Sequence, residues 1–384
     1  MKRLSILFFF LISTATYSQY DTAQVTKLIN KVYSLQVVDD NFYDEGLFKT
    51  QREWGESVME DNSFFYTASM LYIFQQLYPK LSIENKMIVD TIYARATNNV
   101  TKYANRKGEA SYNFWQTNPD TPHPNGKAEY RQSKYGLPDD LDDSVIIASI
   151  LQNDSISILV RGKMVAYAAS NNHKPIQKAP KGYQTTEAYR IWFADQWTQE
   201  IDVVVLCNIL LFVFENQYAL NKYDLATIDF VKKVVTDGDH IHQPKEISPY
   251  YGRPAVILYH LARTIAGDTQ GVLQSIKTQT ISDLENLLPT VQNEYEKMMV
   301  VTSLYRLGKK PVIAIDTSRL LSDRENFYFF YSTSANISFP QYKLWIIKTF
   351  GLIPNLYWKC DVFNKLILLE FLMTTGYSLD SGFL

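Results

Sequence analysis

The chain has 384 residues, with 38 basic and 40 acidic side chains and a formal net charge of −2. This balance provides no basic footprint for nucleic acid or for an anionic membrane surface, so we exclude both as primary partners. Aromatic residues make up 14% of the sequence, which predicts either an aromatic-rich core or a cavity lined by aromatic rings.

Residues 1–18 have the pattern of a cleavable export signal. Lys2 and Arg3 precede an apolar stretch at residues 4–12, and small or mildly polar residues follow up to Ser18. A helix needs roughly 20 apolar residues to cross a bilayer, so this stretch is too short to remain as an anchor. We therefore expect an exported protein, periplasmic or secreted, with no membrane span after the signal is removed.

Beyond the signal, apolar residues recur at three- and four-residue spacing, which is the period of an amphipathic helix. The predicted helices cover residues 22–35, 63–77, 84–103, 141–153, 156–169, 187–194, 200–216, 225–236, 254–265, 273–288, 294–307, 341–350 and 362–374. Gly and Pro separate most of these segments, and no Ser- or Gly-rich linker divides the chain. The fold class that we predict is all-α, as a single α/α toroid over residues 19–384, in which helical hairpins stack into a ring.

Residues 108–138 interrupt this helical pattern with a long segment rich in Pro, Gly and aromatic residues, among them Trp115. Ordered loops of this length often cover a functional site. The segment could equally be a peripheral excursion that packs through its aromatic side chains. Both interpretations remain open at this point.

The sequence Asp139-Asp140-Leu141-Asp142-Asp143 places four carboxyls where a helix is predicted to begin. Acidic residues at a helix start cap free N–H groups and complement the helix dipole, and one or two of them would suffice for that purpose. Four carboxyls in a dry environment repel one another, so at least one pKa should rise until the group keeps its proton near neutral pH. Such a group can act as a general acid.

The stretch Asp140-Leu141-Asp142-Asp143-Ser144 resembles the DxDD-T/S motif of class II terpenoid cyclases such as squalene–hopene cyclase. The predicted ring of hairpins is similar to the α/α toroid that these cyclases share with protein prenyltransferases. The resemblance implies that Asp142 protonates an alkene or epoxide, that Asp140 and Asp143 orient its proton, and that aromatic faces stabilise the cation. The QxxxGxW repeats of the cyclases are absent, and the chain is about one toroid long where those enzymes usually have two.

The same acids also match DDxxD, the magnesium motif of class I terpene synthases, through Asp139, Asp140 and Asp143. Asn153, Asp154 and Ser157 resemble part of the second metal-binding motif of those enzymes, with Arg161 in place of its acid. We reject this interpretation because the two motifs lie one short helix apart and not on opposing helices. His240 and His242 form an HxH pair in a predicted loop, where solvated polar side chains are a better explanation than a metal site. We therefore expect no metal and no cofactor.

Three further residues are predicted to bind substrate together with Trp115. Trp192 and Asp202 precede the apolar run at residues 203–205, and Tyr251 precedes the helix that starts at Pro254. If the inner helices begin at one rim of the ring, these residues face the same mouth as the acidic motif. Asp202 also has a simpler interpretation as a helix cap.

These sequence features are compatible with three functions. The first is a cyclase-like enzyme that starts its reaction by protonating a small apolar, isoprenoid-like substrate. The second is a periplasmic carbohydrate-active enzyme, a hydrolase or lyase that uses paired carboxylates on a saccharide. The third is a toroid without catalytic activity that binds a lipid or a protein.

Overall fold

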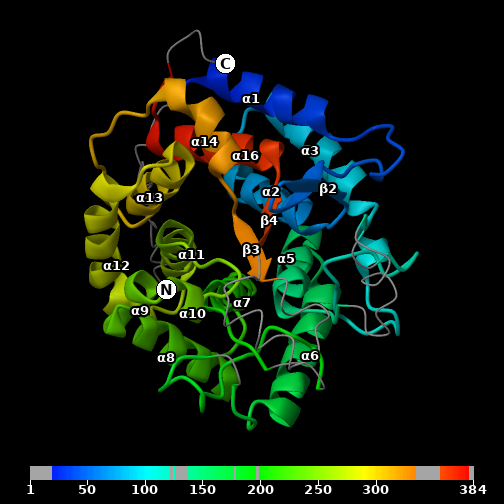
Figure 1. Ribbon diagram of the computed structural model, residues 1–384, viewed down its shortest axis with the longest axis vertical. Coiled ribbons are helices and arrows are strands. Elements are labelled where there is room, and N and C mark those ends of the chain that lie inside the picture. The colour runs from blue at the N-terminus through cyan, green and yellow to red at the C-terminus, as the bar shows by residue number, and fades with distance from the viewer. Residues whose placement is uncertain are drawn as a thin grey trace, which may run out of the picture.

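The computed structural model describes residues 20–121, 124–125, 137–176, 179–195, 199–333 and 355–379, and this part of the chain is mostly helical. The all-α prediction is confirmed at that level, although a small antiparallel sheet is also present. The predicted export signal and the predicted helix at residues 341–350 lie outside the described residues. Figure 1 shows the helices following one another around the molecule, with strands β3 and β4 near its centre.

The helices match the apolar periodicity closely at most positions. Their bounds are α1 Thr22–Leu35, α2 Phe65–Leu77, α3 Ile83–Thr97, α5 Leu141–Leu151, α6 Asp154–Asn171, α7 Val203–Glu215, α8 Lys222–Asp237, α9 Asp239–His242, α10 Pro244–Ile247, α11 Pro254–Gly267, α12 Gln274–Leu287, α13 Glu294–Arg306, α14 Leu320–Asn326 and α16 Asp361–Thr375. The predicted helix at residues 84–103 is divided, because α3 ends at Thr97 and a separate turn follows at Val100–Tyr103.

Six helices contact one another in a closed cycle. Helix α2 packs on α5, α5 on α7, α7 on α11, α11 on α13, α13 on α16, and α16 on α2 again. These helices are buried on nearly every side, and in α7 every residue from Val203 to Phe214 is buried. A helix that is apolar all round must be enclosed by protein, which is why this group forms the interior.

A second group of helices packs on the outside of that cycle. Helix α6 contacts α5, α8 contacts α7, α12 contacts both α11 and α13, and α1 contacts α16. Helix α8 illustrates their character, because its buried residues alternate with exposed ones and a capping box of Asn221 and Asp224 marks its start. The outer helices therefore shield the inner ones while they present polar faces to solvent.

The sheet was not predicted, and its strands come from distant parts of the chain. The strands are β1 Thr50–Trp54, β2 Ser57–Asp61, β3 Phe330–Thr333 and β4 Asn355–Lys359, in the order β2-β1-β4-β3. Strands β1 and β2 form a hairpin, and Gly55 in its turn has a φ of +57°. Across the sheet Arg52 pairs with Trp358, and Trp358 pairs with Phe330 and stacks on its ring. Long-range pairing of short strands leaves little local signal in the sequence.

The predicted helix at residues 187–194 is wrong, because this segment is irregular. Arg190 is buried there, and its guanidinium donates hydrogen bonds to the carbonyls of Thr186, Ala188 and Asn172. In a continuous helix, nearby carbonyls would be engaged by the backbone instead. Trp192 also forms an isolated antiparallel bridge with Asp140, which requires an extended backbone.

Candidate active site

The acidic segment begins a helix, as predicted, with Asp140 as the N-cap of α5. The Asp140 carboxyl accepts a hydrogen bond from the backbone nitrogen of Asp143 at 2.8 Å. On either side, extended segments hold this helix start in place, because Asp140 bridges both Tyr112 and Trp192. Only 4% of Asp140, 6% of Asp142 and 2% of Asp143 is exposed. The motif is therefore enclosed by protein, whereas an ordinary capping cluster would be solvated.

Asp140 and Asp143 form a coupled pair of carboxyls. Burial and repulsion from Asp143 raise the pKa of Asp140 well above its ordinary value. Burial raises the pKa of Asp143 to about 7, although its hydrogen bond with Asp140 acts in the opposite direction. The Asp143 Oδ1 atom is buried without a hydrogen-bond partner among the described residues. The pair therefore holds at least one proton near neutral pH.

Asp142 lies in a different environment from this pair. Its Oδ2 atom accepts a hydrogen bond from the Tyr251 hydroxyl at 2.5 Å, and its Oδ1 atom accepts one from Asn208 Nδ2 at 2.7 Å. Burial raises the pKa of Asp142, while these two hydrogen bonds lower it. The structure thus brings together Asp142 at the start of α5, Asn208 in α7 and Tyr251 ahead of α11, two of which were predicted as site residues.

Asp139, the first acid of the segment, serves a separate purpose. Its carboxyl accepts hydrogen bonds from Asn105 Nδ2 at 2.5 Å, Ser111 Oγ at 2.5 Å and Asn113 Nδ2 at 3.2 Å. Asp139 therefore anchors the loop that contains these three residues. Within the described ranges, no group of three or more His, Cys, Asp or Glu side chains could hold a metal ion.

Asp202 is the N-cap of α7 and braces the segment that leads to α11. Its carboxyl accepts hydrogen bonds from Val204 N at 2.8 Å, Ser248 Oγ at 2.6 Å and Tyr250 N at 3.0 Å. Burial raises the pKa of Asp202 to about 7, against the effect of these hydrogen bonds. The charge of Asp142 contributes to this shift, so the two acids lie close enough to interact.

The two predicted tryptophans are both buried, in different places. The Trp192 indole donates to Glu200 Oε2 at 3.1 Å, and the Tyr250 hydroxyl donates to the same oxygen at 2.5 Å. The Trp115 indole donates to the Asp61 carboxylate, with 3.2 Å to either oxygen, and Asp61 is ion-paired with Arg52. Tyr250 therefore connects Trp192 to Asp202, whereas Trp115 lies beside the sheet. Neither lines the cavity described next, so their contact with a substrate stays a prediction.

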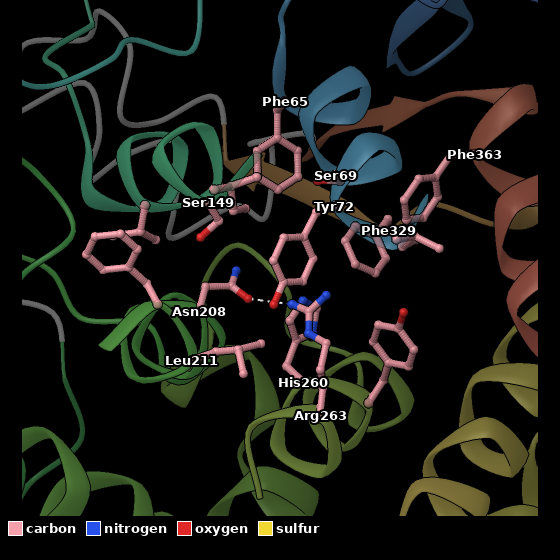
Figure 2. A pocket seen from close by; sticks show the side chains of 15 residues that line it. Phe65, Ser69, Tyr72, Ser149, Asn208, Leu211, His260, Arg263, Phe329 and Phe363 are labelled. Atoms are coloured by element: carbon pink, nitrogen blue, oxygen red, sulfur yellow. Dashed lines mark hydrogen bonds between the residues drawn. The ribbon is translucent and has the colours of Figure 1, made fainter. Parts of the chain in front are cut away.

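A narrow cavity of about 20 Å³ lies among α2, α5, α7, α11 and α16, with room for about one water molecule. Its walls are mostly aromatic or aliphatic, and it also exposes a few polar groups (Figure 2). The aromatic lining residues are Phe65, Tyr72, Phe212, Tyr259, Phe329 and Phe363, and the polar ones are Ser69, Ser149, Asn208, His260 and Arg263. Asn208 connects the cavity to the acidic motif, because it lines the former and donates a hydrogen bond to Asp142.

His260 is neutral in this environment. Its Nδ1 atom lies 2.9 Å from the Val256 carbonyl, which can only accept, so Nδ1 carries the hydrogen. Burial and the charge of Arg263 lower the pKa of His260 well below its ordinary value. The Nε2 atom then has a free lone pair. The sequence indicated an interior or groove histidine, and its 2% exposure agrees with that interpretation.

Arg263 lies one helical turn beyond His260 and carries the only permanent charge among the described residues of the cavity wall. Its Nη2 atom donates to Asn208 Oδ1 at 2.6 Å, and its guanidinium lies 5.0 Å from the ring centre of Tyr72 and 5.6 Å from that of Tyr259. Sequence reasoning missed Arg263 and Tyr72 altogether. The spacing of His260 and Arg263 on one face of a predicted helix was the only signal available for them.

The other candidates from the sequence have plain structural roles. His240 pairs with Asp283 at 2.9 Å, and Arg253 pairs with Glu296 at 2.5 Å. The two cysteines, Cys207 and Cys360, are buried free thiols, so they form no disulfide. Within the part that the structure describes, no helix is both long and apolar enough to cross a membrane.

Comparisons with known proteins do not assign this chain to a family. No model of a known protein family matches it, and no curated protein matches its sequence. The buried acids and the cavity beside them are therefore the features from which a function can be inferred.

Proposed function

We propose that this chain is an exported enzyme that transfers a proton from its buried aspartic acids to an unsaturated, largely apolar substrate, as class II terpenoid cyclases do. We also propose that its architecture is a single α/α toroid. The closed cycle of α2, α5, α7, α11, α13 and α16, with the remaining long helices outside it, fits such a ring.

The observation that carries the proposal is the burial of the acidic motif. Asp140, Asp142 and Asp143 are each at most 6% exposed, and Asn208 links Asp142 to an aromatic-lined cavity. Acids exposed to solvent on the outer surface would exclude this role, because exposed carboxyls are ionised at neutral pH and have no proton to donate. Retention of a proton in a water-poor environment is the requirement for a carboxylic general acid.

The proposed reaction begins with protonated Asp142 and a carbon–carbon double bond. The O–H bond of Asp142 and the π bond of the alkene break, the π electrons form a C–H bond on one carbon, and a carbocation develops on the other. After ring closure the cation returns a proton to solvent. The electron pair of the O–H bond remains on the carboxylate, where the donors Tyr251 and Asn208 stabilise the negative charge. Aromatic faces along the cavity, such as those of Phe65 and Phe329, would stabilise the cation.

The cavity must widen before it can accept such a substrate. A volume of about 20 Å³ holds about one water molecule, far less than an isoprenoid requires. The proposal therefore requires the aromatic walls to move apart when substrate binds. Phe329 is a candidate for this movement, because it lies in the segment between α14 and β3, whereas Phe363 belongs to helix α16.

The two alternatives from the sequence have less support. A carbohydrate-active enzyme would be favoured by an open polar cleft with free, paired carboxylates, whereas Asp142 and Asp202 both accept hydrogen bonds from protein donors. A toroid that only binds a partner gives no reason for carboxyls that keep protons at neutral pH. Such groups cluster at catalytic sites more often than elsewhere.

The test is an incubation of the purified chain with squalene, geranylgeraniol or geranylgeranoic acid in deuterated water, followed by mass spectrometry of the extracted lipids. Protonation by the enzyme should place a single solvent deuterium on a cyclised product. Asp142→Asn should abolish this product, and Asp142→Glu should retain part of it.

The matched control is Asp139→Asn, which alters an adjacent buried acid that bonds only to the loop. It should retain activity. If Asp142→Asn forms the same product at the same rate as the unaltered chain, or if the unaltered chain forms no deuterated product, the proposal is wrong.

A further inference from the structure

The cavity wall contains donors that nothing in the described protein satisfies. The Nε atom of Arg263 is buried without a hydrogen-bond partner. The hydroxyls of Ser69 and Ser149 line the same cavity, and neither has a partner among the described residues. A buried donor that lacks an acceptor costs about 1–3 kcal/mol, so such a group is expected to have a ligand or a water as its partner.

Arg263 also lacks a carboxylate of its own within the described part of the chain. The acids that bond to the cavity residues are all engaged by other donors. Glu215 accepts from Tyr72 at 2.6 Å and Glu370 accepts from Tyr259 at 2.6 Å. Two tyrosine rings flank the guanidinium beside the cavity, and its charge lowers the pKa values of Glu215 and Asp142 without an ion pair to either acid among the described residues.

We propose that Arg263, with the hydroxyls of Ser69 and Ser149, binds the carboxylate group of a ligand in this cavity. Figure 2 shows the polar ends of Tyr72, Asn208 and Arg263 close together, with Ser149 on the neighbouring helix α5. The volume of about 20 Å³ holds about one water molecule, so the walls must move apart to admit the carboxylate, as they must for the rest of the substrate. A guanidinium and neutral hydroxyls together form charge-assisted hydrogen bonds with a carboxylate, which are stronger than those with a neutral acceptor.

A carboxylate fits this site better than a phosphate. His260 is neutral, so Arg263 supplies the only positive charge among the described lining residues, and that charge balances one negative charge. A phosphate carries nearly two charges at neutral pH, and its second charge would remain unpaired in an aromatic environment.

That the bound carboxylate belongs to the substrate rests on the proposed function, whereas the carboxylate site itself does not. The charge of Arg263 is one of the influences that lower the pKa of Asp142. A bound carboxylate would offset this charge, so Asp142 would hold its proton more firmly once the ligand is in place. The substrate class then narrows to unsaturated apolar acids, whose carboxylate end lies near the general acid.

The test uses acetate and its neutral isostere acetamide as probes, because they are small, nearly equal in size and differ in charge. Titrations of the full mature chain would follow the NMR signals of the His260 ring and of the Arg263 Nε–H group. We expect acetate to bind at least tenfold more tightly than acetamide, and phosphate to leave both signals unmoved. Equal affinity for acetate and acetamide, no binding of either, or binding of phosphate would overturn the carboxylate subsite.

Variants separate this site from other binding positions. Arg263→Met should reduce the affinity for acetate at least tenfold, measured on the His260 signals, and leave acetamide unaffected. Arg95→Met removes a guanidinium that also stacks on a tyrosine, at 5.1 Å from Tyr33, far from the cavity lining, and should change neither affinity. An Arg263→Met variant that keeps its preference for acetate would refute the assignment.

Two further variants cover failure to fold and failure of the proposed reaction. Ser149→Val keeps Arg263 and fills part of the cavity, so it should also abolish acetate binding if Arg263→Met does not fold. Asp142→Asn should retain the preference for acetate even though proton transfer is lost. Acetate binding without turnover in the unaltered chain would therefore leave the subsite standing and refute only the proposed function.

Discussion

The pH dependence of stability offers the sharpest test of the buried acidic motif, and Asp143→Asn is the change that isolates it. The native pKa of Asp143 is raised from 3.8 to about 7, while the unfolded chain has the ordinary value. Between these two values the native carboxyl is protonated and the unfolded one is ionised. Because the native state then binds more protons, the free energy of unfolding falls as the pH rises through this window.

The magnitude follows from the size of the pKa change. Each pH unit between the two pKa values corresponds to about 1.4 kcal/mol, so the full effect of Asp143 is roughly 4 kcal/mol. Asp140 shares its proton with Asp143, which spreads the titration over the pair, and we therefore expect about 2–4 kcal/mol. Below about pH 4 both states are protonated and above about pH 7 both are ionised, so the contribution changes only between these limits.

Asp143→Asn removes this titration and leaves a side chain of the same shape. We expect the unfolding free energy of the variant, relative to the unaltered chain, to rise by about 2–4 kcal/mol from pH 4 to pH 8. The amide makes its own contacts with Asp140, and these add an offset that does not depend on the charge of residue 143. Urea unfolding followed by far-ultraviolet circular dichroism at several pH values measures the difference directly.

The comparison cancels titrations that both proteins share. His260 has a lowered pKa and so makes stability rise with pH up to about 6.5, opposite in sign to Asp143, but it is present in both chains. Asp237→Asn is the control, because the pKa of Asp237 is lowered by Lys233 and its effect lies below pH 4. A stability gap between Asp143→Asn and the unaltered chain that stays constant or narrows with rising pH would contradict a buried, protonated carboxyl at this position.

Three further predictions concern other buried polar groups. Arg52→Met should destabilise the fold by about 3–5 kcal/mol in guanidinium unfolding, because the fully buried Asp61 loses its ion-pair partner, and adding Asp61→Asn should recover much of that loss. Asp139→Ala should cost about 1–3 kcal/mol and accelerate hydrogen exchange in the loop that it anchors, since three donors lose their acceptor. Cys207 and Cys360, whose pKa values burial raises to about 12, should resist Ellman's reagent at pH 8 until the protein is unfolded; rapid labelling of the native chain would contradict their burial.

Much of the fold could be predicted because its signals are local. Helix α5 starts after Pro138 with Asp140 as its cap, and helix α7 starts after Asp202 in the same way. Helix α11 starts at Pro254, which is favoured in a first turn. Each of these starts depends on a few adjacent residues, so periodicity and capping chemistry were sufficient to locate them.

The sheet and the segment around Arg190 could not be predicted for the opposite reason. Strand β1 pairs with β4 through Arg52 and Trp358, which are separated by most of the chain. The apolar spacing at residues 187–194 suits a helix, yet burial of Arg190 requires nearby carbonyls as acceptors. Tertiary contacts decided both cases, because they outweigh the modest local preferences of such short segments.

The candidate site likewise has one part that the sequence predicts and one part that only tertiary contacts determine. Four carboxyls in five residues identify the acidic motif from the sequence alone, since repulsion between neighbours in the chain does not depend on the fold. Only the tertiary structure decided that all four acids are buried and that Asp139 anchors a loop. It also brought Asn208 and Tyr251 to Asp142 and Arg263 to the cavity, because a site made from three helices exists only once those helices pack.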